Sequence, residues 1–228
     1  MREATVRSAL RAALGPAFAV SRREVARFLD QRLGMQTEGE VELDDLGVAG
    51  ADRGRYQPAR WLTLVRILPR AGVGPDDVFI DFGSGKGRVV CQAARRYACR
   101  RVIGVELSAD LNAVARANVD RQRHHFRCRD VELVTSDVLD YAIPDDVTIA
   151  FFNNPFTGAV FASVIDRLIA SVDARPRPLR VIYAHRSEEP YLLGTGRFVA
   201  VRTARGLRPG RRWSDETAVR MYRCIPPP

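Results

Sequence analysis

From about residue 56 onward, short apolar runs alternate with segments in which apolar residues recur three and four positions apart. The runs are rich in β-branched and aromatic residues, which is typical of buried strands. They lie near residues 78–82, 101–106, 131–135, 147–152 and 179–184. Two more runs, near 197–204 and 217–224, predict an antiparallel edge. Because strands and helices alternate, we expect an α/β fold with a seven-stranded, mostly parallel sheet.

Two amphipathic helices are expected before the first strand. The apolar positions are Val6, Leu10 and Leu14 in residues 2–14, and Val25, Phe28, Leu29 and Leu33 in residues 22–33. Gly15-Pro16 separates the two segments, since this pair breaks a helix. An acidic link with six carboxylates then runs from Gly34 to Gly54. We therefore divide the chain into an N-terminal part, 1–54, and a main domain, 55–228.

The most informative segment follows the first strand. The run at 78–82 leads into Gly83-x-Gly85-x-Gly87 and then directly into a stretch with helical spacing. A strand, a glycine turn and a helix N-terminus present free backbone N–H groups at the carboxyl end of a parallel sheet, where open α/β folds bind ligands. Glycines are needed because a Cβ would keep the turn from touching the ligand. The segment predicts a nucleotide-type cofactor site.

Three cofactor loops are compatible with a glycine turn of this kind. A phosphate-binding loop needs four residues between its first glycine and a Gly-Lys-Ser/Thr, and this spacing is missing. A dinucleotide loop would place its third glycine at Arg88, where a large side chain would crowd the helix against the strand. An S-adenosylmethionine loop suits Asp81, just before the first glycine, because that cofactor carries a cationic ammonium and no phosphate. An ordinary tight turn would not need three glycines and an aspartate.

The ends of the next two strands carry carboxylates. Glu106 lies 21 residues after Gly85, and such a carboxylate can accept both hydroxyls of a ribose, at roughly 1.5–3 kcal/mol for each bond. Dinucleotide-binding dehydrogenases bind a ribose through a carboxylate in the same way, so Glu106 alone does not distinguish S-adenosylmethionine from a dinucleotide. Asp137, with Val138 beside it, suits the N6 amine and the face of an adenine. Asp137 as a helix N-cap is the structural alternative.

Taken together, these motifs resemble the class I S-adenosylmethionine-dependent methyltransferases. Residues 81–87 are similar to the first motif of that family, Glu106 to the second, residues 136–138 to the third and residues 151–156 to the fourth. The resemblance spans roughly residues 56–223. It implies a Rossmann-like sheet, S-adenosylmethionine as the cofactor, and N-terminal helices that cover the site or simply pack on it. The cofactor-binding residues it implies are Tyr56, Asp81, Phe82, Gly83, Ser84, Gly85, Gly87, Glu106, Leu107, Asp137, Val138 and Asn153.

A narrower resemblance concerns the methyl acceptor. Tyr56-Gln-Pro58-Ala, followed by a helix and then by the glycine loop, is similar to the protein-lysine methyltransferases that lack a SET domain. That group includes archaeal, mitochondrial and nucleosomal histone-lysine enzymes, and the histone enzymes also carry paired asparagines before an aromatic residue. Two departures are Lys86 after Gly85, and Pro155-Phe156, which resembles the motif of amide and adenine N-methyltransferases.

These departures leave several acceptors open. A protein lysine is favoured, and a small-molecule N- or O-acceptor of bacterial secondary metabolism is the main alternative. RNA methylation and an NAD(P)-binding oxidoreductase are further alternatives.

Methyl transfer needs few catalytic groups, because orientation and desolvation of the nucleophile supply most of the barrier reduction. The candidate catalytic residues are Asn153, Asn154, Phe156 and His185. The asparagines can accept hydrogen bonds from an amine or a hydroxyl, Phe156 can pack over it, and Tyr56 can close the methyl end. His185 is a candidate general base, with a structural histidine as the alternative. Glu188 and Glu189 either bind a cationic acceptor or begin a helix.

Composition fits one catalytic domain. A chain of 228 residues with 46% hydrophobic content can bury a full α/β core. No apolar run of about 18 residues occurs and charged residues interrupt the start of the chain, so we expect a cytoplasmic protein without a membrane partner. The four cysteines lack Cys-x-x-Cys spacing, which indicates free thiols. His124-His125 with Cys128 lacks a fourth ligand, so no metal is expected.

The formal net charge is +9, and Lys86 is the only lysine. The arginines are spread along the whole chain, which indicates the codon bias of a GC-rich genome. Two clusters, Arg95 to Arg101 and Arg121 to Arg129, could contact phosphates. No aromatic residues that could stack on bases are interleaved with them, so we interpret these arginines as a solvated helix face rather than a nucleic-acid site. The oligomeric state does not follow from the sequence.

Overall fold

The computed structural model describes residues 23–42, 44–47, 50, 52–205 and 218–226. The helix expected at residues 2–14 and the Gly15-Pro16 break lie outside the described residues. In the part of the chain that the structure describes, no helix is both long and apolar enough to cross a membrane.

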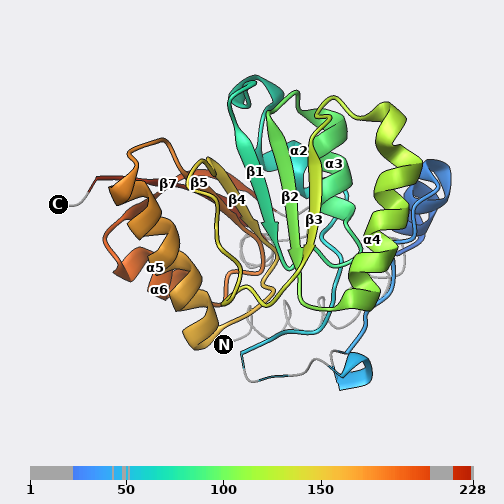
Figure 1. Ribbon diagram of the computed structural model, residues 1–228, viewed down its shortest axis with the longest axis horizontal. Coiled ribbons are helices and arrows are strands. Elements are labelled where there is room, and N and C mark those ends of the chain that lie inside the picture. The colour runs from blue at the N-terminus through green and yellow to red at the C-terminus, as the bar shows by residue number, and fades with distance from the viewer. Residues whose placement is uncertain (1–22, 43, 48–49, 51, 206–217, 227–228) are drawn as a thin grey trace, which may run out of the picture.

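The seven predicted strands form one mixed sheet (Figure 1). They are β1 (Val78–Phe82), β2 (Arg101–Glu106), β3 (Val131–Thr135), β4 (Ile149–Phe152), β5 (Arg180–Tyr183), β6 (Phe198–Ala204) and β7 (Val219–Cys224). Their order is β3-β2-β1-β4-β5-β7-β6, and β7 runs antiparallel to both of its neighbours. The predicted α/β class and the antiparallel edge are confirmed. The strand order reverses between β1 and β4, which is where open α/β sheets bind ligands.

Helices cover both faces of the sheet. They are α2 (Thr63–Ile67), α3 (Arg88–Arg96), α4 (Ala109–Gln122), α5 (Gly158–Ala174) and α6 (Glu189–Gly194), with the short 3-10 helices η1 (Asp44–Leu46), η2 (Arg70–Gly72) and η3 (Arg123–His125). One core cluster joins α2, α3 and α4 to Phe79, and the other joins α5 and α6 to Val78 and Ile80. Successive β1 side chains thus enter opposite cores, as alternation along a strand requires.

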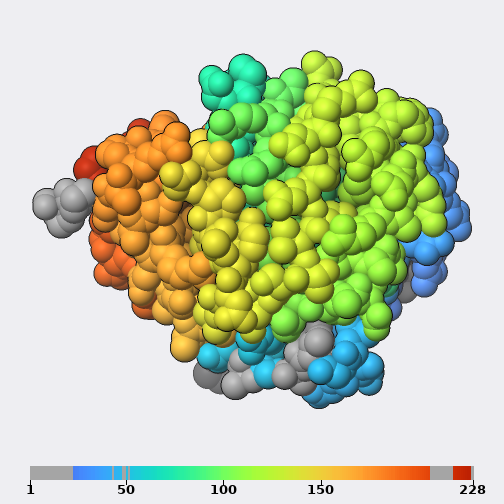
Figure 2. All heavy atoms as spheres, in the orientation of Figure 1, coloured from blue at the N-terminus to red at the C-terminus, as the bar shows by residue number. Residues whose placement is uncertain are grey.

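The carboxyl ends of β1, β2 and β3 point toward the lower rim of the molecule in Figure 1, and the described residues of the link, in light blue and cyan, run along that rim. In the space-filling view, described residues of the link lie at the lower edge of the molecule, in light blue (Figure 2). This arrangement brings part of the acidic link against the glycine loop.

Residues 23–33 are helical, as predicted, but only part of the expected apolar face is buried: Leu29 and Leu33 are half-buried, and Leu33 packs against the core. Val25 and Phe28 are 58% and 57% exposed, while Ala26 and Asp30 are buried. The helix is turned so that the Asp30 carboxylate accepts hydrogen bonds from Thr37, through its backbone N–H and its hydroxyl, both at 2.7 Å. The pattern of apolar residues could not predict this rotation, because it is set by a buried polar contact.

Candidate active site

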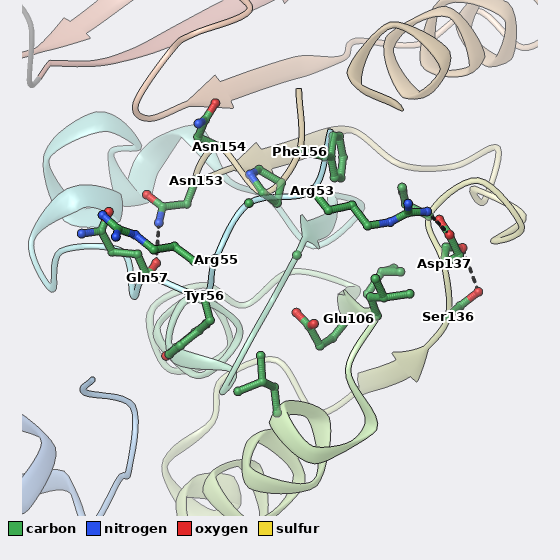
Figure 3. Close-up of a pocket in the computed structure, with 17 residues that line it drawn as sticks. Arg53, Arg55, Tyr56, Gln57, Glu106, Ser136, Asp137, Asn153, Asn154 and Phe156 are labelled. Carbon is green, nitrogen blue, oxygen red and sulfur yellow. Dashed lines mark hydrogen bonds and ion pairs between the residues drawn. The ribbon is translucent and has the colours of Figure 1, made fainter. Parts of the chain in front are cut away.

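A cavity opens at the carboxyl ends of β1, β2, β3 and β4 (Figure 3). It is lined by Arg53 and Gly54 of the link, Arg55–Gln57 just after it, Gly83 of the glycine loop, Val105–Leu107 at the end of β2, Leu111 of α4, Ser136–Val138 after β3, and Asn153–Phe156 after β4. The segments that the sequence suggested as four separate motifs therefore meet at one place.

The glycine loop has the backbone that its residues predict. Gly83, Gly85 and Gly87 have φ angles of +70°, +53° and +76°, in the left-handed region that side chains disfavour. A Cβ on Gly83 would lie 2.3 Å from Pro155, and one on Gly85 would lie 2.2 Å from the Tyr56 ring. The glycines thus also let Tyr56, and Pro155 of the fourth motif, approach the loop, a packing role that the sequence did not reveal.

Glu106 presents a buried carboxylate to the cavity. It is 6% exposed, and its two oxygens accept one backbone N–H each, from Gly85 at 2.7 Å and from Ser108 at 2.9 Å. Burial raises the pKa of this carboxyl, and the N–H groups of Ser108 and Gly85 partly offset the rise. A carboxylate has about four acceptor positions, so about two remain for a ligand. These free acceptor positions fit the two hydroxyls of a ribose, which would donate to them.

Asp81 lies behind the cavity wall rather than in it, in the fully buried strand β1. Burial, and then the nearby Glu106 carboxylate, raise its pKa well above the ordinary value. Among the described residues, no arginine or lysine forms an ion pair with either carboxyl. Two buried acids without a cation favour a positively charged ligand nearby. The ammonium of S-adenosylmethionine fits this requirement.

Asp137 is engaged on both carboxylate oxygens. One accepts the backbone N–H of Leu139 at 3.0 Å, and the other pairs with the guanidinium of Arg53. No helix follows, so Asp137 caps a turn rather than a helix N-terminus. Arg53 pairs through its backbone with Phe156 in an isolated β-bridge and reaches across to Asp137 (Figure 3). The ion pair therefore spans the end of the cavity where an adenine is predicted.

The two asparagines of the fourth motif differ in their contacts. Asn153 donates from Nδ2 to the Gln57 carbonyl at 2.8 Å, and its Oδ1 accepts no hydrogen bond from the described residues. Asn154 has a φ of +55°, and its Oδ1 accepts the hydroxyls of Tyr183 at 3.0 Å and of Ser187 at 2.6 Å. Of the two asparagines, only Asn153 has an amide oxygen that no described residue occupies, so this oxygen can accept a hydrogen bond from the molecule to be methylated.

Tyr56 and Phe156 complete the walls of the cavity. The Tyr56 hydroxyl donates to the Thr37 carbonyl at 2.6 Å, and burial raises its pKa, so the ring alone faces the cavity. Phe156 is 5% exposed and meets Phe152 edge-on, with 5.9 Å between ring centroids. Both aromatic side chains exclude water from the site.

Some predicted residues lie outside the cavity lining. Among the cofactor-binding set these are Asp81, Phe82, Ser84, Gly85 and Gly87. The Phe82 ring faces the core and stacks on Phe152 at 5.0 Å, because neighbouring strand residues point to opposite faces. His185 is exposed, has a φ of +51°, and lines a second cavity beyond Gln57 instead.

Glu189 begins α6 and is held by its neighbours. It accepts hydrogen bonds from Arg220 at 2.6 Å, from Tyr222 and from Arg186. Burial by itself would raise its pKa, but these partners lower it. Glu189 therefore begins a helix and anchors α6 to β7, which is the structural alternative to binding a cationic acceptor.

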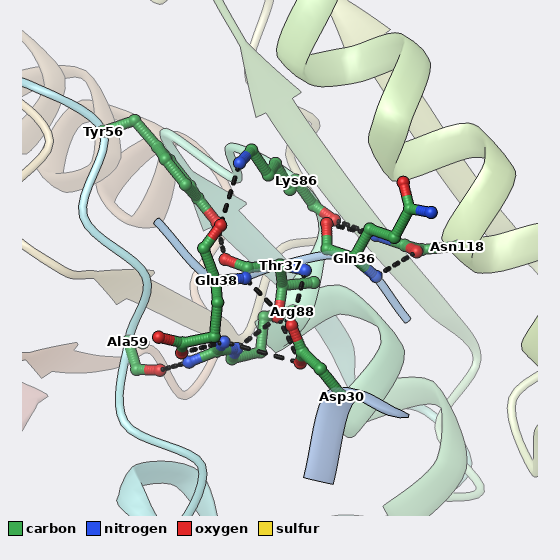
Figure 4. A network of polar contacts seen from close by, with 9 residues as sticks. All are labelled: Asp30, Gln36, Thr37, Glu38, Tyr56, Ala59, Lys86, Arg88 and Asn118. Atoms are coloured by element: carbon green, nitrogen blue, oxygen red, sulfur yellow. Dashed lines mark hydrogen bonds and ion pairs between the residues drawn. The ribbon is translucent and has the colours of Figure 1, made fainter. Parts of the chain in front are cut away.

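A buried network joins the link to the far side of the glycine loop (Figure 4). Arg88 donates to the Thr37 hydroxyl at 2.6 Å, to the Ala59 carbonyl at 2.9 Å and to the Glu38 carboxylate at 2.5 Å, and it lies 3.5 Å from Asp30. Lys86 donates to the Glu38 carbonyl at 3.0 Å. Lys86, which departs from the usual glycine-loop pattern, and Arg88, which argues against a dinucleotide loop, thus attach the link to the loop.

Sequence reasoning missed several residues that line the cavity, among them Arg53, Arg55, Gln57 and Leu111. Gln57 belongs to the Tyr56-Gln-Pro58 motif and could have been included on that ground. Arg53 carries no such signal, because it lies in the link, and its position follows only from the pairing with Phe156.

The chain is similar to known proteins in its central part. Residues 59–170 match the family described as histone methylation protein DOT1. A histone-lysine N-methyltransferase specific for H3 lysine 79 from Caenorhabditis elegans is 44% identical over 45 residues, which are 20% of this chain and 5% of that protein. A protein-lysine N-methyltransferase from Saccharolobus islandicus (strain REY15A) is 32% identical over 66 residues, 29% of this chain and 41% of that protein. Each match thus spans less than half of the curated relative.

Among solved structures, precorrin 8W decarboxylase from Methanobacterium thermoautotrophicum superposes with a TM-score of 0.52 at 20% sequence identity. The match covers 75% of this chain and 92% of that one. At this identity it shows the shared fold alone.

Proposed function

We propose that this chain, a class I S-adenosylmethionine-dependent methyltransferase by its fold and its sequence matches, transfers methyl groups to the side-chain amine of a protein lysine. The observation that carries the proposal is the match of residues 59–170, which includes all four motifs around the cavity. The similarity to two protein-lysine methyltransferases supports lysine as the acceptor.

Different residues around the cavity would bind different parts of the cofactor. Glu106 would accept the ribose hydroxyls, Val138 would pack against the adenine, and Asp81 would place negative charge near the ammonium. Bound S-adenosylmethionine supplies an electrophilic methyl on a sulfonium. The fit rests on the two free acceptor positions of Glu106 and on the acidic pair that has no cation among the described residues.

The acceptor would approach from the side of Asn153. Its free Oδ1 and the carbonyl before Pro155 can hold an amine so that its lone pair points into the cavity. The rings of Tyr56 and Phe156 keep water away, which makes the amine a better nucleophile. His185 lies in the neighbouring cavity, so the amine would lose its proton to solvent rather than to a base in the site.

A small-molecule N- or O-acceptor is the second candidate. It is supported by Pro155-Phe156, which resembles the motif of amide and adenine N-methyltransferases and lines the cavity after β4. An acceptor of this kind would use the same Asn153 oxygen.

Two measurements test the proposal. Calorimetry should show that S-adenosylhomocysteine binds and that NAD does not; tighter binding of NAD would overturn the cofactor assignment. Radiolabelled methyl transfer into protein, RNA and small-molecule fractions of a lysate should label protein, with the label on lysine by mass spectrometry. Label confined to small molecules would replace the lysine proposal by the second candidate.

A further inference from the structure

Arg53 places a guanidinium group at the end of the active-site cavity where an adenine is predicted, and the proposed function gives it no role. Its side chain is 21% exposed, lines the cavity and pairs with Asp137 (Figure 3). A guanidinium carries five N–H donors. Among the described residues, this one donates only to Asp137, so several donors remain beside the cavity without an acceptor. A largely buried donor without a partner is costly, and a ligand can supply the missing acceptor.

Contacts on both sides of Arg53 hold its backbone in place. The carbonyl of Asp52 accepts the Thr157 N–H at 2.7 Å, and its carboxylate accepts a backbone N–H in the first turn of α5 at 3.1 Å. After Arg53, the Gly54 N–H donates to the Pro155 carbonyl at 3.1 Å. The φ of Asp52 is +65°, which is uncommon for residues other than glycine. The fold therefore sets the position of the guanidinium, as a binding residue requires.

Arg53 and Asp137 together present a hydrogen-bond donor beside an acceptor. One Asp137 oxygen accepts the Leu139 N–H at 3.0 Å and the other pairs with Arg53, so about two of the four acceptor positions of the carboxylate remain. One edge of adenine has the matching pattern, because its N6 amine donates and the neighbouring ring nitrogen N7 accepts. A base with a carbonyl at position 6 would meet the carboxylate with a second acceptor and would be disfavoured.

The other edge of adenine also places a ring nitrogen, N1, beside the N6 amine. The backbone N–H of Val138 suits N1, because Val138 follows Asp137 directly, lines the cavity, and donates from its N–H to none of the described residues. Arg53 comes instead from the side of β4, where its backbone pairs with Phe156. With N1 assigned to Val138, N7 is the ring nitrogen that remains for Arg53.

We propose that Arg53 determines specificity for the base of the cofactor: its guanidinium donates a hydrogen bond to N7 of the adenine while Asp137 accepts one from the N6 amine. The inference rests on the proposed function, which places the cofactor in this cavity, and it adds a residue of the link to the binding site. If Arg53 served only to fasten the link across the cavity, removing N7 from the ligand would not change its affinity.

The test compares S-adenosylhomocysteine with its 7-deaza analogue, in which a C–H group replaces N7 and the N6 amine is unchanged. Calorimetry should show that the wild type binds the analogue roughly tenfold more weakly, as one charge-assisted hydrogen bond predicts. In Arg53→Met, S-adenosylhomocysteine should bind roughly tenfold more weakly than in the wild type, and the two ligands should differ by about twofold or less. The control Arg101→Met removes an arginine of similar exposure, 26%, from its ion pair with Asp146 at the start of β2, and should keep the difference.

A second variant covers the case in which Arg53→Met disturbs the link. Arg53→Lys keeps a cation beside Asp137 but lacks the planar fork of donors, so it should retain the link and lose most of the difference between the two ligands. Equal affinity of the wild type for both ligands, or an undiminished difference in both variants, would overturn the inference. Tighter binding of S-adenosylhomocysteine by Arg53→Met would also overturn it, because the ion pair would then compete with the cofactor. Failure of the wild type to bind S-adenosylhomocysteine would instead contradict the proposed placement of the cofactor itself.

Discussion

Two clusters of buried charge flank the glycine loop, and they differ in how completely they are neutralised. On one side, Arg88 meets two carboxylates, a hydroxyl and a carbonyl, so its charge is balanced within the chain (Figure 4). On the other side, Asp81 and Glu106 are two acids with raised pKa values and no cationic partner among the described residues. Both clusters are conspicuous in the sequence as charged residues close to glycines.

The difference separates a structural cluster from a ligand site. A buried charge is tolerated when partners replace the water it loses, and the Arg88 cluster does this within the chain. The acidic pair is costly in the ligand-free protein, and a cationic ligand with hydroxyl groups would remove that cost. A buried charge that the chain leaves without a partner is therefore the better sign of a ligand site, while a buried charge that the chain neutralises indicates a role in folding.

The largest expected effect is on stability, at Arg88. Arg88→Met would leave Asp30 and Glu38 without this cationic partner and should lower the free energy of unfolding by about 3–5 kcal/mol. Urea unfolding measures the change. Arg95→Met, in the same helix, removes one hydrogen bond to Gln122 and serves as the control, with an expected loss of about 1 kcal/mol. Equal losses in the two variants would mean that the Arg88 cluster is not a special element of the fold.

The next effect is on cofactor affinity, at Glu106. Glu106→Ala should weaken S-adenosylhomocysteine binding by about 2–4 kcal/mol, because two charge-assisted hydrogen bonds to the ribose are lost. Calorimetry measures the affinity, and circular dichroism checks that the variant is folded. Unchanged affinity would mean that Glu106 serves only to order the loop through Gly85 and Ser108.

The paired asparagines also differ in this way: the side-chain oxygen of Asn154 is bound within the chain, and that of Asn153 is not. Asn153→Ala should lower kcat by roughly 10- to 100-fold and change cofactor affinity far less, because its free oxygen acts on the methyl acceptor chiefly in the transition state. Asn154→Ala should lower stability by about 1–2 kcal/mol, because two hydroxyls lose their acceptor. Steady-state kinetics and thermal unfolding separate the two effects. Normal turnover in folded Asn153→Ala protein would remove this residue from the mechanism.

The smallest expected effect is a gain of stability, at Asp81. Its pKa is raised in the folded state, so the folded protein retains a proton that the unfolded chain releases, and stability falls as pH rises through the folded pKa. Asp81→Asn should therefore stabilise the ligand-free protein by about 1 kcal/mol at neutral pH and flatten its pH dependence, while weakening cofactor binding. Thermal unfolding between acidic and neutral pH tests this. Lower stability of the variant at neutral pH would contradict the proposed cost of the acidic pair.

Several features of the molecule followed directly from the sequence. The strands were predictable because their apolar, β-branched runs must be buried wherever they lie, and the glycine loop because only glycine adopts its positive φ angles at little cost. The motifs ending β1 to β4 had to meet, because the carboxyl ends of parallel strands share one edge of the sheet.

Contacts between segments distant in the chain were decided only by the tertiary structure. Arg53 reaches Asp137, and Asn154 is bound by Tyr183 and Ser187 while Asn153 keeps its oxygen free. A sequence pattern records which side chains are polar, whereas the partner that each one finds depends on packing across the whole fold. For the same reason the pattern of apolar residues did not predict that the helix at residues 23–33 buries Asp30, where Thr37 satisfies its carboxylate, and leaves Phe28 exposed.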